Sequence, residues 1–252
     1  MNNPKLSVCT TNYNCDHALK RHLDSLYSIL DENEFEYIVV DGKSKDNSME
    51  ILGEYQKNHN NMIVLSDKCS IGRGRQIAFE KSNGKYIVVV DTDTVYLPRC
   101  KDFIKICLEK FSDFAVQAIY CGVYPKEVWK ESGGRRNMNV KEDVDAWMRI
   151  WELGKMKFYP VSMGRNIKEV DRTASMDYLS VRYGKTEKFL RLFMREIDLL
   201  KARWYNKYDF FKVYRNNIID MGLGQHERWF FEVPKRPWPV KVTRDVIRIL
   251  KS

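Results

Sequence analysis

The chain has 252 residues, 44% hydrophobic and 31% charged, a balance that is typical of a soluble globular protein and excludes an intrinsically disordered one. No apolar run approaches the roughly 20 residues that a membrane-spanning helix needs, and no signal-peptide core precedes the first apolar segment, so we expect a cytoplasmic protein. The six cysteines include no C-x-x-C pair, which argues against a disulfide framework and against a structural zinc site.

The excess positive charge lies in the C-terminal third of the chain. Residues 165–252 contain 20 Lys and Arg against 11 Asp and Glu, whereas residues 1–164 contain 23 of each. This asymmetry predicts two regions, a balanced one over 1–164 and a basic extension over 165–252. It also indicates an anionic partner for the extension, which could be phosphate-bearing lipid, a membrane surface or nucleic acid.

Strand-like and helical segments alternate through the first half of the chain. Strands are predicted at 6–10, 37–40, 62–65 and 86–90. Helices are predicted between them at 16–30, about 48–55 and 72–82, with Asp16 as the cap of the first helix. Because strands that alternate with helices form parallel βαβ units, we expect an α/β protein with three layers and a mainly parallel central sheet.

The pattern continues beyond the fourth strand. A helix is predicted at 98–111 and a strand at 114–119, before a loop rich in glycine and arginine at 131–139. The last helix of this region is predicted at 140–153. Asn139 and Glu142 stand three positions apart at its start, a spacing that resembles a capping box.

Two acids, Asp91 and Asp93, follow the most apolar predicted strand at 86–90. Side chains alternate along an extended chain, so both carboxylates are expected on the same side, roughly 6–7 Å apart. Ligands bind at the carboxyl ends of strands in open α/β sheets. A divalent metal that bridges to a ligand phosphate would offset the repulsion between the acids. The alternative is a common turn with two solvated acids.

Five motifs occur in the order that is typical of one enzyme family. They are Thr11-Asn12-Tyr13-Asn14, the loop 39–46, the segment 74–78, Asp91-Thr92-Asp93, and Gly133-Gly134 followed by Glu142, Asp143, Asp145 and Arg149. Together they cover roughly residues 5–155 and resemble family 2 glycosyltransferases of the GT-A fold. The resemblance implies a catalytic domain over 1–164, with a nucleotide-sugar half at about 1–97 and an acceptor half at about 98–164, followed by a helical C-terminal extension.

On the donor side, the resemblance implies a nucleotide-sugar and a divalent metal, Mg²⁺ or Mn²⁺. Asp93 is expected to hold the metal, and Asp91 to lie nearer the ribose and the water shell of the metal. The residues expected to border the base, the ribose or the rest of the nucleotide are Thr11, Tyr13, Asp41 and Arg75. Gly42 stands where the family often has a second acid that reads the base, so donors linked to UDP and to GDP both remain open.

On the acceptor side, an inverting transfer to a hydroxyl group needs a carboxylate that removes the proton. Asp143 is the predicted base and Glu142 is its competitor, although a capping role would occupy Glu142. Asp145 is expected to be solvated or paired with Arg149. Arg135 and Arg136 either contact phosphates or form a solvated pair. A phosphate acceptor, which is already ionised, would need no base.

The histidines are divided by position. His226 lies beyond the acidic motif, where the family often supplies a further metal ligand, so the resemblance implies that it completes the metal site. His17, His22 and His59 fall on predicted surface positions, and we expect no catalytic role for them.

Two segments of the basic extension, 186–205 and 242–250, combine apolar, aromatic and basic residues. They could form interfacial helices that dock on an anionic membrane near a lipid-linked acceptor, or helices that pack on the core. Binding to nucleic acid is disfavoured because nothing in the first half supports it.

The sequence therefore predicts a metal-dependent, inverting glycosyltransferase. It would move a sugar from a nucleotide-diphosphate donor to a hydroxyl or a lipid phosphate, with a glycan or lipid-linked acceptor. It would act in the cytoplasm or, if the extension binds lipid, at the cytoplasmic membrane face. The alternative is a non-catalytic protein of the same fold that binds nucleotide-sugars or anionic polymers.

Overall fold

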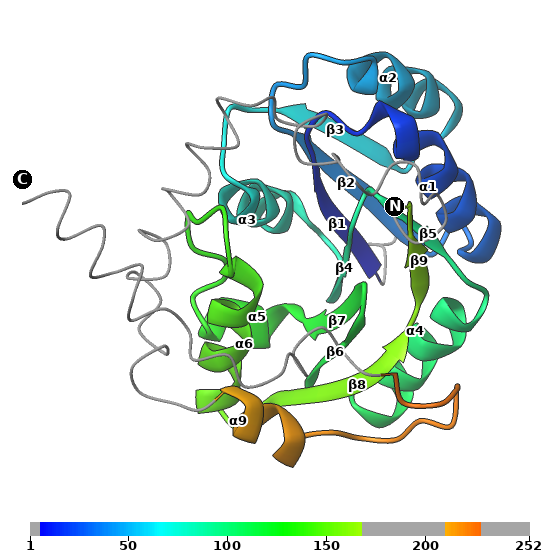
Figure 1. Ribbon diagram of the computed structural model, residues 1–252. Coiled ribbons are helices and arrows are strands. Elements are labelled where there is room, and N and C mark those ends of the chain that lie inside the picture. Colours follow the sequence, from blue (N-terminus) through cyan, green and yellow to red (C-terminus); the bar gives the residue numbers. More distant parts are fainter. Residues whose placement is uncertain (1–5, 168–209, 228–252) are drawn as a thin grey trace, which may run out of the picture.

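The computed structural model describes residues 6–167 and 210–227. Its centre is a seven-stranded sheet in the order β3-β2-β1-β4-β7-β6-β8 (Figure 1). The strands are β1 Leu6–Asn12, β2 Phe35–Asp41, β3 Met62–Ser66, β4 Tyr86–Val90, β6 Ala115–Ile119, β7 Cys121–Pro125 and β8 Met156–Ser162. A second, two-stranded sheet pairs β5 Thr94–Tyr96 with β9 Gly164–Asn166.

Helices cover both faces of the large sheet. One face packs against α1 Asp16–Ile29, α2 Ser48–Asn58 and α4 Arg99–Lys110. The other packs against α3 Ile71–Lys81, α5 Lys126–Glu131, α6 Glu142–Glu152 and α9 Phe210–Asn216. Residues of β4 alternate between the two cores, with Val88 and Val90 on one side and Ile87 and Val89 on the other. The predicted three-layer α/β architecture is confirmed.

The central sheet is mainly parallel, as predicted, since β3, β2, β1 and β4 run in the same direction and β6 is parallel to β8. The exception is β7, which is antiparallel to both β4 and β6. The sequence interpretation did not include β5, α5, β7, β8, β9 or α9. The predicted boundary between residues 164 and 165 falls inside β9.

Two helix starts differ from the prediction. Cys15, not Asp16, occupies the cap position of α1, and the Asp16 carboxylate instead accepts a hydrogen bond from the backbone N–H of Asn47 at 3.2 Å. Helix α6 begins at Glu142 after Lys141, which has a left-handed backbone with φ of 61° and makes no side-chain cap. The predicted capping box of Asn139 and Glu142 is therefore wrong, and the Glu142 carboxylate is used elsewhere.

The described part of the basic extension packs on the sheet. The backbone of Phe158 in β8 donates to Asn217 and accepts from Ile219, both at 2.9 Å. Phe210 and Tyr214 of α9 contact the same aromatic core. The predicted helices at 186–205 and 242–250 lie outside the described residues. Within the described ranges, no helix combines the length and the apolar character that a membrane span requires.

Candidate active site

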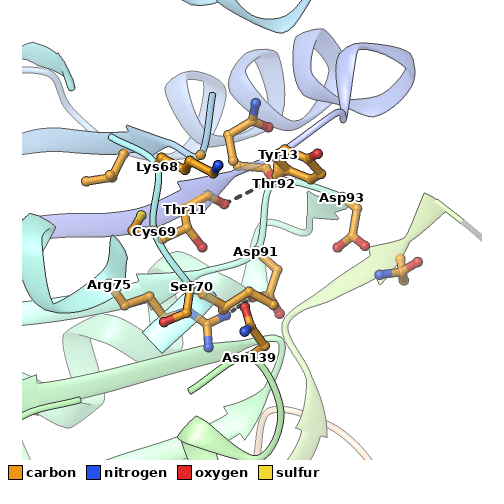
Figure 2. Close-up of a pocket in the computed structure, with 15 residues that line it drawn as sticks. Thr11, Tyr13, Lys68, Cys69, Ser70, Arg75, Asp91, Thr92, Asp93 and Asn139 are labelled. Atoms are coloured by element: carbon orange, nitrogen blue, oxygen red, sulfur yellow. Dashed lines mark hydrogen bonds and ion pairs between the residues drawn. The ribbon is translucent and has the colours of Figure 1, made fainter. Parts of the chain in front are cut away.

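A pocket of about 390 Å³ opens at the carboxyl ends of β1, β2 and β4 (Figure 2). The pocket is lined by the predicted metal ligand and by four residues that were predicted to contact the nucleotide or the water bound to the metal. These residues are Thr11, Tyr13, Arg75, Asp91 and Asp93. The fold therefore brings side chains from three separate motifs to one place, as expected for the edge of a parallel sheet.

The two acids sit on a turn and not on an extended strand. Strand β4 ends at Val90, and the backbone N–H of Thr94 donates to the carbonyl oxygen of Asp91 at 3.2 Å. The expectation that simple strand alternation places both carboxylates is therefore wrong. Figure 2 shows Asp91 close to Arg75, whereas Asp93 stands apart from Arg75 in the same pocket.

Helix α1 and Tyr96 hold this acidic turn in place. The hydroxyl of Tyr96 accepts the backbone N–H of Asp91 at 3.0 Å and donates to the carbonyl oxygen of Tyr120 at 2.6 Å. The His22 ring lies between the carbonyl oxygen of Thr94 at 2.9 Å and the Tyr37 hydroxyl at 2.6 Å. Because the carbonyl can only accept, Nδ1 of His22 carries the proton and Nε2 accepts from Tyr37.

His22 is fully buried, so its predicted surface position is wrong. Burial lowers its pKa to about 4, which keeps the ring neutral at physiological pH. A neutral ring can make both hydrogen bonds, and its role is to fix the segment that follows the acids.

Arg75 joins the donor and acceptor halves of the protein. Its Nη2 donates to Oδ1 of Asp91 and its Nη1 to Oε1 of Glu142, both at 2.5 Å. Burial alone would lower the pKa of Arg75, but the two carboxylates more than offset this and raise it. Burial raises the pKa of Asp91, and Arg75 opposes that shift. The guanidinium thus supplies a shared counter-charge to the partly exposed Asp91 and to the buried Glu142.

Glu142 and Asp143 occupy the first turn of α6, and neither is among the residues that line the pocket. Glu142 is 6% exposed, and burial, followed by the charge of Asp143, raises its pKa to about 7. Asp143 is half-buried, and its Oδ1 accepts the backbone N–H of Val144 at 2.7 Å. Of the two acids, Glu142 is committed to Arg75 and Asp143 is the more accessible.

The raised pKa of Glu142 gives a testable dependence of stability on pH. The folded protein holds a proton on Glu142 up to about pH 7, whereas the unfolded chain releases it near pH 4.5. Wild type should therefore lose stability as pH rises from about 4.5 to 7. In Glu142→Gln this loss should be absent. The free energy of unfolding of the variant, measured by urea denaturation, should therefore increase relative to that of wild type as pH rises from about 4.5 to 7.

Glu80→Gln, an exposed replacement on α3, corrects for the general effect of removing one charge. A stability difference between Glu142→Gln and wild type that stays constant from pH 4.5 to 7 would contradict the prediction.

A second ion-pair network fixes the Gly133-Gly134 loop. Asp145 is 2% exposed and pairs with Arg149 at 2.9 Å, so the predicted pairing is confirmed and the solvated alternative is wrong. Arg149 also donates to the carbonyl oxygens of Ser132 and Gly134. Gly134 has φ of 65°, and a Cβ there would lie 2.2 Å from Oε1 of Gln76, so a larger residue would be strained and would displace Gln76 from Arg135.

The two arginines that follow this loop have different environments. Arg136 pairs with Asp145 at 3.1 Å and remains partly exposed. Arg135 is 4% exposed, and its guanidinium lies 5.2 Å from the centre of the Trp129 ring. The alternative of a solvated arginine pair is therefore wrong for Arg135.

Besides Glu142 and Asp143, two further predicted site residues lie outside the pocket, Asp41 and His226. Asp41 is fully buried, and its carboxylate accepts from the Asn12 amide at 2.9 Å and from the hydroxyl and backbone N–H of Ser44 at 2.6 and 2.8 Å. It shapes the loop after β2, and contact with the nucleotide stays a prediction. His226 is half-exposed, and its ring packs edge-on against Tyr159.

The predicted metal ligands do not form one cluster. Among residues 6–167 and 210–227, no group of three His, Cys, Asp or Glu side chains is arranged to hold a metal ion. The structure therefore does not bring His226 to Asp91 and Asp93. The oxygen-bearing side chains of the pocket include the two acids and the amides of Asn12, Asn139 and Asn166. Hard oxygen ligands of this kind suit Mg²⁺ or Mn²⁺, so this donor set fits such an ion when phosphate and water supply the rest.

The sequence interpretation gave no ligand-binding role to six residues that line the pocket outside the five motifs, which are Lys68, Cys69, Ser70, Ile71, Asn139 and Asn166. Each lies in or beside a segment with no recognisable motif. Asn166 belongs to β9, which reaches the pocket only because it pairs with β5 directly after the acidic turn.

A mixed sheet with this strand order, an acidic turn after β4 and a pocket beside it are the features expected of the GT-A fold. The chain belongs to glycosyl transferase family 2, because the model of that family matches residues 7–176. The recognition made from the five motifs is confirmed.

Several curated relatives are similar to this chain. A poly(ribitol-phosphate) beta-glucosyltransferase from Bacillus spizizenii is 29% identical over 170 residues, which is 63% of this chain and 25% of the relative. The putative teichuronic acid biosynthesis glycosyltransferase TuaG from Bacillus subtilis is 30% identical over 36% of each chain. YibD, an uncharacterized glycosyltransferase from Escherichia coli, is 26% identical over 84% of this chain and 62% of its own. The chain thus spans a quarter to under two thirds of these relatives.

Solved structures support the fold. Mannosyltransferase PcManGT from Pyrobaculum calidifontis, in complex with GDP-Man and Mn²⁺, has a TM-score of 0.61 at 14% identity, covering 85% of this chain and 73% of its own. Residues 1–349 of TarS from S. aureus give a TM-score of 0.57 at 16% identity, with 80% and 73% covered. A further crystal structure of that TarS segment contains UDP-GlcNAc.

Proposed function

We propose that this protein transfers a sugar, with inversion, from a UDP- or GDP-linked donor to a hydroxyl group of a glycan or lipid-linked acceptor. The observation that carries the proposal is the pocket at the carboxyl ends of β1, β2 and β4, lined by both acids of the turn. Complexes of similar folds with UDP-GlcNAc and with GDP-Man support a nucleotide-sugar donor.

On the donor side, Thr11 and Tyr13 line the pocket where the base and ribose are proposed to bind. Asp93 would hold a divalent ion, which when bound supplies positive charge for the leaving diphosphate. Arg75 holds the side chain of Asp91 and the Tyr96 hydroxyl holds its backbone, so Asp91 would contact the donor from a fixed position. The Mn²⁺ in the PcManGT complex supports the use of such an ion.

On the acceptor side, Asp143 is the proposed general base. The acceptor hydroxyl attacks the anomeric carbon while its proton passes to the Asp143 carboxylate, and the bond from sugar to diphosphate breaks. A single displacement of this kind inverts the anomeric centre. Glu142 is a poorer base because Arg75 binds one of its oxygens.

The acceptor is proposed to carry negative charge. Two of the similar proteins have names that refer to poly(ribitol-phosphate) and to teichuronic acid, and both names describe acidic polymers. A phosphate or carboxylate near the reacting hydroxyl would therefore be a shared feature of the acceptors.

The decisive experiment measures nucleotide release from a panel of UDP- and GDP-sugars, with Mg²⁺, with Mn²⁺ and with EDTA. We expect release from at least one donor only when a divalent ion is present. Binding of a donor without release under every condition would reject the proposal in favour of a non-catalytic nucleotide-sugar binding protein.

Replacing Asp143 with asparagine should lower kcat for a hydroxyl acceptor by about 10²- to 10⁴-fold, because the amide cannot take the proton. Donor affinity should change little, and calorimetric titration with the nucleotide checks this. Glu152→Gln, an exposed replacement at the other end of α6, serves as the control. An Asp143→Asn variant with wild-type turnover would exclude Asp143 as the base or indicate a phosphate acceptor.

A further inference from the structure

Unpaired hydrogen-bond donors gather beside the Gly133-Gly134 loop. In the described part of the chain, six buried side-chain polar atoms have no hydrogen-bond partner. Four of the six are N–H donors, namely Nε of Arg75, Nε1 of Trp129, and Nε and Nη1 of Arg135. Buried donors left without acceptors are costly, and a charged donor costs more than a neutral one.

Three of these donors belong to two side chains in contact. The guanidinium of Arg135 lies over the Trp129 ring, 5.2 Å from its centre. The backbone of Arg135 is fixed because its N–H donates to Oε1 of Gln76 at 2.8 Å. Arg149 holds the preceding carbonyl oxygens, so the loop presents Arg135 in one position. A cation held this firmly, and still lacking acceptors, is preorganised for a ligand.

The neighbouring acids do not satisfy Arg135. Burial raises the pKa of Asp91 and of Glu142, and the positive charge of Arg135 opposes both shifts. Those carboxylates already accept hydrogen bonds from the two terminal nitrogens of Arg75. Arg135 therefore lies near the acidic ends of both halves of the site without an ion pair of its own in the described residues.

We propose that Arg135, supported by Trp129, binds the negatively charged group of the acceptor and so selects anionic acceptors. Only an acceptor of hydrogen bonds can satisfy these donors, and phosphate and carboxylate oxygens pair best with guanidinium. Arg149 and the ion pair of Arg136 with Asp145 tie the loop that carries Arg135 to α6, which places this contact on the acceptor side. The inference rests on the proposed function and adds to it the residue that reads the charge.

The test compares matched charged and neutral probes by calorimetric titration of the full chain, with and without nucleotide. Ribitol 5-phosphate is compared with ribitol, and methyl glucuronide with methyl glucoside. Wild type should bind the charged member of at least one pair about 10- to 100-fold more tightly than its neutral partner. The pair with the larger difference identifies phosphate or carboxylate as the recognised group.

Arg135→Gln should abolish this preference, and Arg135→Lys, which keeps the charge with fewer donors, should retain only part of it. Arg73→Gln is the control, because Arg73 is an exposed arginine of α3 that pairs with Glu80. If Arg135→Gln fails to fold, Arg135→Lys carries the comparison.

Equal binding of charged and neutral probes by wild type would overturn the inference. So would an Arg73→Gln variant that loses the preference as fully as Arg135→Gln, since the effect would then be diffuse electrostatics. The proposed function is judged separately, by metal-dependent nucleotide release without any acceptor. Release without charge selectivity would reject only the role of Arg135.

Discussion

Asp93→Ala is expected to lower metal-dependent nucleotide release by at least about 100-fold while leaving the fold intact. Arg75 holds Asp91, the other acid of the turn, at 2.5 Å, and Asp93 lines the pocket apart from that pair. Its carboxylate is therefore the acid best placed to bind a divalent ion beside the diphosphate. The measurement is the rate of nucleotide release over a titration with Mn²⁺.

The variant series separates loss of metal binding from loss of structure. Asp93→Asn keeps one oxygen and the side-chain shape but loses the charge, so it should need much more Mn²⁺ for the same rate. Asp113→Asn replaces an exposed acid before β6 and should match wild type. If Asp93→Ala releases nucleotide with an unchanged dependence on Mn²⁺, another residue holds the ion, or none is needed.

The sequence predicted a strand correctly where both faces of that strand are buried in the protein. The run Tyr86–Val90 is β-branched or aromatic throughout, and it forms a strand whose residues face two cores in alternation. Strands β5 and β9 have only three residues each, too few to show a period. Strand β7 contains both glycine and proline, which weaken any strand signal.

The sequence predicted several of the residues that line the pocket, but not the contacts that these residues make with one another. Motif order brought Thr11, Tyr13, Arg75 and Asp91 to one pocket, but their partners were not visible in the sequence. Arg75 and Glu142 are 67 positions apart, and only the packing of α3 against α6 joins them. The spacing of Asn139 and Glu142 instead suggested that Glu142 caps the helix. A glutamate at the start of a helix can serve either in a capping box or in an ion pair, so the sequence does not distinguish the two.

The same contact explains why one acid at α6 differs from its neighbour. Burial raises the pKa of Glu142 although Arg75 opposes the shift and holds its carboxylate, whereas Asp143 is more exposed and has no ion pair with Arg75. Two adjacent carboxylates with different environments can take different roles. In this site the buried Glu142 is held by Arg75, which leaves the more accessible Asp143 as the base that we propose.

Arg75→Met should cause the largest loss of stability of any single change in this site. The replacement preserves most of the side-chain length but leaves the carboxylates of Asp91 and Glu142 without their shared cation. Removing one partner from a buried ion pair costs about 3–5 kcal/mol. Thermal unfolding should show this as a fall in Tm of roughly 6–20 °C for a domain of this size.

The contribution of Glu142 to that cost can be isolated by a double variant. Arg75→Met combined with Glu142→Gln should recover part of the lost stability, because a glutamine needs no counter-charge. The cost of Arg75→Met should also shrink as pH falls below about 7, where Glu142 takes up a proton. Arg73→Met, an exposed replacement two positions away on α3, should stay within about 0.5 kcal/mol of wild type. Equal losses for Arg73→Met and Arg75→Met would mean that the bridge between the two halves of the site does not stabilise the fold.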